Sequence, residues 1–168
     1  MLRSDTYEDV EHDRGATLQA LLVVILVSIS GGVGSLFRDD ASVGDALILG
    51  VILGIVSWAV WALTTWIIGS TILKTADTEA DWGQLARGTG FAQTPGILSF
   101  LVFLPGLGWL VTLVIFVWRV AAMLVAVRQC LDYKSTWRAF FVVLIAAIPS
   151  LIIVGIVGAL LGLGDTGS

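Results

Sequence analysis

Long apolar stretches separated by short charged segments make up most of this chain. Three of them have clear limits, at residues 17–37, 46–73 and 139–163. Each meets the requirement of about 20 apolar residues for a helix that crosses a hydrocarbon layer of ~30 Å. A soluble protein of this length has no core that could hide such runs. The pattern therefore predicts an all-α fold, a polytopic transmembrane helical bundle.

The middle of the chain allows two interpretations. Residues 96–127 carry a single charge, Arg119. One helix over this range would be about 48 Å long at 1.5 Å per residue, which exceeds the membrane thickness. The turn formers Pro and Gly in Pro105-Gly106-Leu107-Gly108 predict a tight hairpin that joins a short span at about 88–104 to another at about 107–127. The alternative is one kinked span and four crossings in total.

Basic residues distinguish the two interpretations, since Lys and Arg accumulate in cytoplasmic loops. With four spans they would be divided evenly between the two sides. With five spans and a cytoplasmic N-terminus, Arg38 alone lies outside, and the inner side holds Arg3, Arg14, Lys74, Arg87, Arg128, Lys134 and Arg138. We therefore predict five spans, with a cytoplasmic N-terminal segment at 1–16, a membrane domain at 17–163 and an external tail at 164–168.

Composition agrees with a membrane protein and excludes several kinds of site. Hydrophobic residues make up 57% of the chain and charged residues 13%, against about a quarter charged in soluble domains. One His and one Cys are too few for a zinc, haem or iron–sulfur site, and we expect no cofactor. The net charge of −4 argues against a nucleic-acid partner. The acidic N-terminus does not resemble the basic lead of a signal peptide.

The segment TEADWGQLAR, residues 78–87, predicts a short interfacial helix before the third span. Thr78 and Asp81 form a start like a capping box. The apolar residues Trp82, Leu85 and Ala86 are expected to face lipid, whereas Asp81, Gln84 and Arg87 are expected to face water. Gly88 and Gly90 would then let the chain turn into the membrane.

Just inside the third span stand Gln93, Thr94 and Pro95. Proline frees the carbonyl four residues earlier, that of Phe91, which needs another donor in hydrocarbon. Arg119 lies at a similar expected depth in the fourth span. Our hypothesis is that Arg119 donates to this polar kink and holds the two spans together. The alternative is that its side chain snorkels to the membrane surface.

Pairs of small residues predict close helix packing, because such pairs let membrane helices approach each other. They occur as Gly50 with Gly54, Ala122 with Ala126, and Gly158 with Gly162. Together they indicate a compact bundle, and the sequence leaves open whether any of them marks a homodimer surface.

Three segments resemble a prokaryotic member of the Ypt-interacting protein (Yip) family of small multi-spanning membrane proteins. They are TYEDVEHDRGATLQALLVV, TEADWGQLARGTGFAQTPGIL and VWRVAAMLVAVRQCLDYKSTWRAFFVVLI. The resemblance implies five spans, a cytoplasmic N-terminus and a non-enzymatic protein. Eukaryotic relatives bind Rab-type GTPases, but their Asp-Leu-Tyr-Gly-Pro element is absent here, so the resemblance does not imply Rab binding for this chain.

We predict a non-enzymatic scaffold or organiser of the cell (plasma) membrane, or a small accessory subunit of a larger membrane complex. Its partners would be the lipid bilayer and other membrane subunits or a second copy. The expected contacts lie on the cytoplasmic face: the acidic N-terminal segment and residues 77–81 and 128–138. The alternative is a small transporter or channel, against which stands the lack of any Asp or Glu in mid-span. His12, alone in a charged tail, does not indicate an enzyme.

Overall fold

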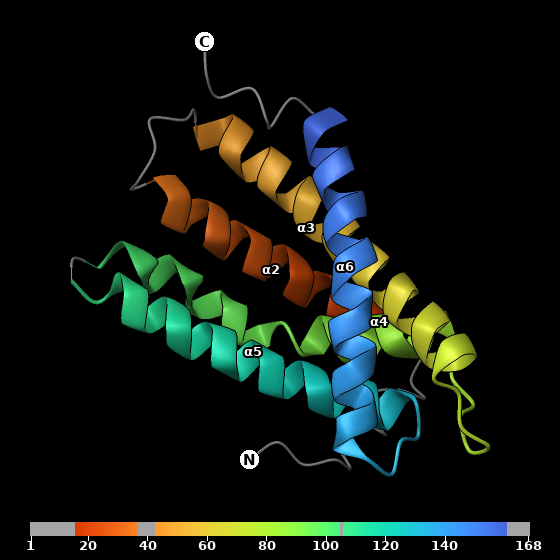
Figure 1. Ribbon diagram of the computed structural model, residues 1–168. Coiled ribbons are helices and arrows are strands. Elements are labelled where there is room, and N and C mark those ends of the chain that lie inside the picture. Colours follow the sequence, from red (N-terminus) through yellow and green to blue (C-terminus); the bar gives the residue numbers. More distant parts are fainter. Residues whose placement is uncertain (1–15, 37–42, 105, 161–168) are drawn as a thin grey trace.

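The computed structural model describes residues 16–36, 43–104 and 106–160, which form helices and their connections (Figure 1). The predicted segments 1–16 and 164–168 lie outside these ranges, except for Ala16. The elements are α2 (Ala16–Leu36), α3 (Val43–Ile67), the π-helical turn η1 (Ile68–Ile72), α4 (Trp82–Phe91), the 3₁₀ helix η2 (Thr94–Phe103), α5 (Gly108–Cys130) and α6 (Thr136–Leu160).

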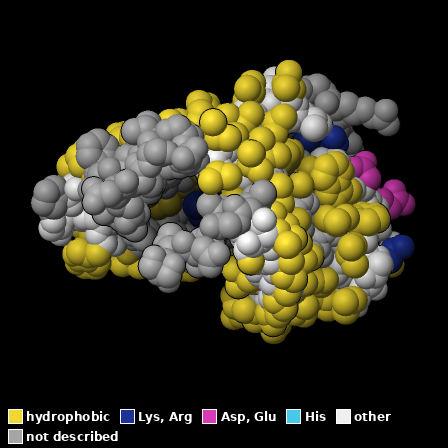
Figure 2. All heavy atoms as spheres, turned by 90° about the horizontal axis from the view of Figure 1, so that it is seen from above, with side chains coloured by type: hydrophobic (Ala, Val, Ile, Leu, Met, Phe, Trp, Pro, Cys, Tyr) yellow, Lys and Arg dark blue, Asp and Glu magenta, His cyan; other side chains and the backbone are white. Residues whose placement is uncertain are grey.

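Four stretches are long and apolar enough to cross a membrane: Ala16–Val33, Leu47–Ile72, Gly108–Cys130 and Thr136–Leu160. A helix suits such segments because it satisfies every backbone polar group internally, as hydrocarbon requires. Hydrophobic side chains cover most of the described surface on the face seen in Figure 2. Many large ones point outward, such as Leu151 at 72% exposed and Leu160 at 81%. The all-α, multi-pass membrane fold predicted from the sequence is confirmed.

The segment predicted as the third span is not one continuous helix. Its first part is the end of α4 and its second part is η2, with a break at residues 92 and 93. Pro95 explains the break, since it has no N–H to continue the α-helical ladder. A 3₁₀ helix rises about 2.0 Å per residue, so the ten residues of η2 reach about 20 Å. Because this segment is broken, it is not among the four long helices, and the total of five crossings stays a prediction.

The chain reverses between η2 and α5, at the position of the predicted hairpin (Figure 1). Gly106 has a φ of 76°, a conformation that side-chain-bearing residues rarely adopt. Leu104 accepts hydrogen bonds from the N–H groups of Leu107 and Gly108 at 3.2 and 3.0 Å. A Cβ at Gly108 would lie 2.3 Å from the Val102 carbonyl oxygen. The turn therefore depends on both glycines.

Helix α2 lies at the centre of the bundle, packed against α3, α4 and η2. On their other sides, α4 and η2 contact α5, so the broken segment (α4 and η2, residues 82–103) lies between α2 and α5, with Phe100 and Phe103 of η2 still exposed. Helix α6 packs on α3 and crosses the others steeply (Figure 1). Its buried side chains, Ala139, Val142, Ala146 and Ser150, all lie in its first fifteen residues. The remaining part of α6 presents its side chains to the surroundings.

The short helix α4 begins as a capping box at Asp81, whose side chain accepts from the Gln84 N–H at 2.9 Å. Thr78 is not part of this cap, since its hydroxyl bonds with Thr75 instead. The faces expected for this helix hold for Asp81 and Trp82, which are exposed, but they were wrong for three other residues. Leu85 and Ala86 are fully buried, and Arg87, expected in water, is 6% exposed. Helix α4 lies among α2, α3 and α5 because its glycines allow those helices to approach closely.

Candidate functional site

The structure brings Arg119 to Gln93 at the kink of the broken segment. Arg119 Nη2 donates to Gln93 Oε1 at 3.3 Å. The Phe91 carbonyl, which Pro95 prevents from accepting an α-helical bond, instead accepts from the Thr94 hydroxyl at 2.6 Å. Arg119 therefore contacts the kink through Gln93, and Thr94 satisfies the freed carbonyl within the same segment.

Arg119 stands at the middle of α5, eleven residues from each end (119 − 108 and 130 − 119), or about 16 Å at 1.5 Å per residue. An arginine at such a depth costs roughly 2.5–3.5 kcal/mol on insertion scales, so it needs polar partners. Gly96 of η2 lies beside it, since a Cβ there would be 3.7 Å from Arg119 Nη1, an ordinary van der Waals distance. The guanidinium thus lies at the seam between α5 and η2.

Only some of the predicted small-residue pairs take part in packing. A Cβ at Gly54 would lie 1.8 Å from the Ser28 hydroxyl oxygen, which makes Gly54 a contact point of α2 and α3. Ala122 and Ala126 are buried with Ala92 of the kink. Gly50 and Gly158 have no neighbour within 4 Å of a built Cβ, and Gly162 lies outside the described residues.

Three glycines of the broken segment also lie where neighbouring helices approach closely. A Cβ at Gly88 would lie 2.5 Å from Cys130 Sγ, one at Gly90 would lie 2.9 Å from Ala20 Cβ, and one at Gly96 would lie 2.7 Å from Val27 Cγ1. The first is a contact with α5 and the other two are contacts with α2. In the sequence we interpreted Gly88 and Gly90 as turn residues only. Their spacing with Ala86 and Ala92 was an available signal for packing.

Hydroxyl and indole groups bridge the helices at points that the sequence analysis missed. The Ser30 hydroxyl of α2 inserts into η2, where it donates to the Ile97 carbonyl and accepts from the Phe100 N–H at 3.0 Å. An undisturbed 3₁₀ helix would pair those two backbone groups with each other. Trp58 Nε1 of α3 donates to the Ala86 carbonyl of α4 at 2.8 Å. Polar atoms of α2 and α3 therefore fix the broken segment.

A bridge of this kind joins α6 to α3. The hydroxyls of Thr64 in α3 and Ser150 in α6 are 2.6 Å apart. Ser150 follows Pro149, the proline inside α6. A Pro-Ser pair within an apolar stretch was the signal in the sequence for this contact.

At one end of the bundle, the loop after η1 and the loop before α6 form one surface, which we call the loop face (residues 73–81 and 128–138). The Tyr133 hydroxyl lies 2.9 Å from the Gly69 carbonyl oxygen and 3.0 Å from that of Leu73. Leu131 fills the space above Gly69, where a Cβ would lie 2.4 Å from Leu131 Cδ1. Asp132 adopts a φ of 52°, which turns the chain between these two anchors. The loop before α6 is thus fastened to the π-helical end of α3.

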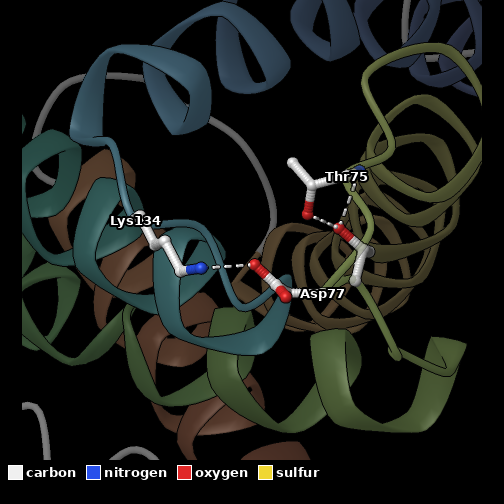
Figure 3. A network of polar contacts seen from close by, with 4 residues as sticks. Thr75, Asp77 and Lys134 are labelled. Atoms are coloured by element: carbon white, nitrogen blue, oxygen red, sulfur yellow. Dashed lines mark hydrogen bonds and ion pairs between the residues drawn. The ribbon is translucent and has the colours of Figure 1, made fainter.

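A salt bridge closes the loop face, with Lys134 Nζ 2.7 Å from Asp77 Oδ2. In Figure 3 the Lys134 side chain reaches across from its own loop to Asp77, beside the hydroxyl contact of Thr75. A cleft of about 490 Å³ lies here, lined among others by Asp132, Trp137 and Arg138. The guanidinium of Arg138 is 5.8 Å from the centroid of the Tyr133 ring. Charged and aromatic side chains therefore surround a concave surface.

Two groups of the loop face have shifted proton affinities. The hydrogen bond and charge of Asp77 raise the pKa of Lys134 above its ordinary value. Burial raises the pKa of the Tyr133 phenol, although the charge of Arg138 opposes this shift. Both groups are therefore in their usual protonation states at neutral pH, with Lys134 charged and Tyr133 neutral.

In residues 16–36, 43–104 and 106–160 no group of three or more His, Cys, Asp and Glu side chains could hold a metal ion. The loop face instead offers paired charges, hydroxyls and the large aromatic side chain of Trp137, and Phe141 of α6 lines the same cleft. Such a set of groups is suited to binding another molecule at the end of the bundle.

Comparison with known proteins places the chain in one family. No curated protein and no solved structure matches the chain. The model of the Yip1 domain matches residues 3–159, which includes every element described above except the last residue of α6. Because this match covers nearly the whole chain, the protein belongs to the Yip family.

Proposed function

We propose that this integral membrane protein is a non-enzymatic scaffold or a small accessory subunit of a larger membrane complex, and that the loop face binds its partner. The observation that carries this proposal is the Lys134–Asp77 salt bridge, at 2.7 Å. It joins two loops that are far apart in the sequence into one surface with a cleft. Together with the Tyr133 anchor, it gives a partner a preformed site, which reduces the entropy lost on binding.

The proposal includes the orientation of the protein in the membrane. The starts of α2, α4 and α6 lie at the same end as the ends of η1 and α5. Supporting contacts are Thr17 with Arg87, Cys130 with the Gln84 carbonyl, and Tyr133 with Gly69. Elements that alternate in this way favour five crossings. The loop face carries Lys74, Arg128, Lys134 and Arg138, and the preference of basic residues for the cytoplasm favours a cytoplasmic loop face and N-terminus. The plasma membrane is the location that we propose.

A transporter is less well supported by the same residues. A pathway through the membrane needs polar groups along its length. In the described parts of the four long helices, every charged residue except Arg119 lies within three positions of a helix end. The Arg119 side chain is bonded to Gln93 within the bundle.

The test is site-specific photo-crosslinking in native membranes. A photoreactive residue at Ser135 would report on the loop face, and one at Leu151, on the unpacked part of α6, would serve as the matched lipid-facing control. We expect a defined protein adduct at Ser135 that is weakened by Asp77→Asn and Lys134→Met together. Native gel electrophoresis with mass spectrometry would then identify the partner. Migration as a lone monomer, with no protein adduct at Ser135, would refute the proposal.

A further inference from the structure

The described residues satisfy the guanidinium of Arg119 only in part. Arginine carries five N–H donors. In the described ranges the hydrogen bond of Arg119 is the single one to Gln93 Oε1, and it is long at 3.3 Å. Arg119 has no ion pair among the described residues. Most of its donors and its whole charge therefore remain for another group.

Water and lipid headgroups are too distant to be that group. Arg119 is about 16 Å along α5 from either helix end, close to the half-thickness of the hydrocarbon layer. An extended arginine side chain covers less than half of that distance. The guanidinium is also held at the seam with η2 by Gln93, and it lies beside Gly96. It thus stays near the middle of the membrane.

No described residue of this chain supplies a counter-charge at this depth. Helices α2, α5 and α6 contain no Asp or Glu, and Asp45 of α3 is the third residue of that helix, at its membrane edge. A second copy of the same described helices would bring no mid-membrane carboxylate either. A different molecule can therefore supply the anion.

The side of α5 next to Arg119 is open to such a molecule. Arg119 itself is half-buried, between the buried face of Ile115 and Ala122 and the outward side that carries Phe116, three residues before it. Phe116 is 63% exposed. A helix laid along this side would cover Phe116 and place its own side chains beside the guanidinium.

We propose that Arg119 is the docking point for a partner transmembrane helix that carries a Glu or Asp near its centre. A carboxylate accepts two parallel N–H bonds from a guanidinium, which makes this pairing strong and directional. In hydrocarbon the pair would satisfy both partners, each of which is costly alone. This inference rests on the proposed accessory role and deepens it by naming the chemistry of the partner.

The test uses a defined probe, a polyleucine transmembrane peptide of about 20 residues with one central Glu, and an otherwise identical peptide with Gln. The full-length protein is reconstituted in phosphatidylcholine vesicles. A dansyl group on the peptide reports binding by energy transfer from the tryptophans of the protein. We expect the Glu peptide to bind at least roughly tenfold more tightly than the Gln peptide, because the charge-assisted pair exists only with Glu. Equal binding of the two peptides would overturn the proposal without any variant being needed.

Two variants give the matched controls. Arg119→Gln keeps an amide that can bond to Gln93 but removes the charge, and it should abolish the preference for Glu. Gln93→Leu keeps the charge and removes its acceptor, so the preference should persist or increase. A preference that survives in Arg119→Gln would also overturn the proposal. A failed crosslink at Ser135 with a preserved peptide preference would count against the loop face alone, so the two proposals fail separately.

Discussion

Backbone polar groups at membrane depth must be satisfied without water, and two parts of this protein do so in opposite ways. One is the broken segment of α4 and η2, and the other is the continuous helix α6. The broken segment is irregular, yet α2, α3 and α5 surround it and side chains from α2 and α3 bond to its backbone. Helix α6 is regular, and beyond Ser150 none of its described residues is buried. Irregular backbone at membrane depth is tolerated where protein encloses it, whereas lipid-facing backbone must satisfy itself. The stability of this bundle should therefore reside mainly in its least regular part.

The largest expected effect comes from adding a side chain to the enclosed segment. Gly90→Val places new atoms within 2.9 Å of Ala20 Cβ and 3.4 Å of the Ala20 carbonyl, which belongs to the backbone of α2. Overpacking of this kind costs about 3 kcal/mol, and we expect loss of folded protein. The control Gly158→Val, in α6, has no neighbour within 4 Å and should leave the unfolding temperature unchanged. Thermal unfolding followed by size-exclusion chromatography in detergent measures both. Equal effects of the two variants would mean that the broken segment is packed no more tightly than the end of α6.

The next effect tests the hydroxyl inserted into η2. Ser30→Ala leaves the Ile97 carbonyl and the Phe100 N–H without the group that joins them. Unmet buried backbone groups cost about 1–3 kcal/mol, and we expect a loss of about 2 kcal/mol in the free energy of unfolding. Thr112→Ala is the matched control, since this hydroxyl is exposed and bonds within its own helix at 2.8 Å. Denaturant titration in mixed micelles would measure the difference. No change in Ser30→Ala would mean that the two backbone groups pair directly.

A smaller loss of stability is expected when the hydroxyl contact between α6 and α3 is removed. Ser150→Ala removes the hydroxyl contact with Thr64, but it leaves the helix ladder in place. Hydrogen bonds between membrane helices average about 0.6 kcal/mol, and we expect a loss of that size in the same titration. A loss as large as that of Ser30→Ala would show that α6 is fixed as firmly as the broken segment.

The smallest effect concerns the exposed salt bridge of the loop face. The pKa of Lys134 is raised by Asp77, so the contribution of the pair is complete below the ordinary lysine pKa of 10.5 and is lost as the pH rises through the raised value. Because Lys134 is fully exposed, we expect only a slight shift of unfolding temperature between the protein and Lys134→Met at pH 8, and a smaller one as the pH rises above 10.5. Tyr133 titrates in both proteins, so its effect cancels when the unfolding temperature of Lys134→Met is subtracted from that of the unchanged protein at each pH. A difference that grows above pH 10 would have the wrong sign.

The membrane class and the long helices followed from the sequence because apolar runs have few alternative structures. The hairpin at Gly106 and the capping residue Asp81 were likewise predictable from local chemistry. Local chemistry also placed Arg119 near Gln93 in depth, although it did not foresee that Thr94 would satisfy the Phe91 carbonyl.

The faces of α4 and the packing role of Gly96 could not be derived in the same way. Leu85 and Arg87 look amphipathic in isolation, and their burial results from α2 and α5, which approach from distant parts of the sequence. Small-residue pairs also do not reveal which of them meet a partner, since Gly54 does and Gly158 does not. Periodicity within one helix contains no information about the helix on the other side.

The enclosure of η2 has a consequence for how this protein is made. While the ribosome is still synthesising α5, the broken segment would expose its irregular backbone to lipid on the side that α5 later covers. Ser30 of α2, made earlier, is already able to bond to the Ile97 carbonyl and the Phe100 N–H. We expect η2 and α5 to leave the translocon together, as a hairpin that closes onto α2. The order of synthesis would then match the order in which the polar groups become satisfied.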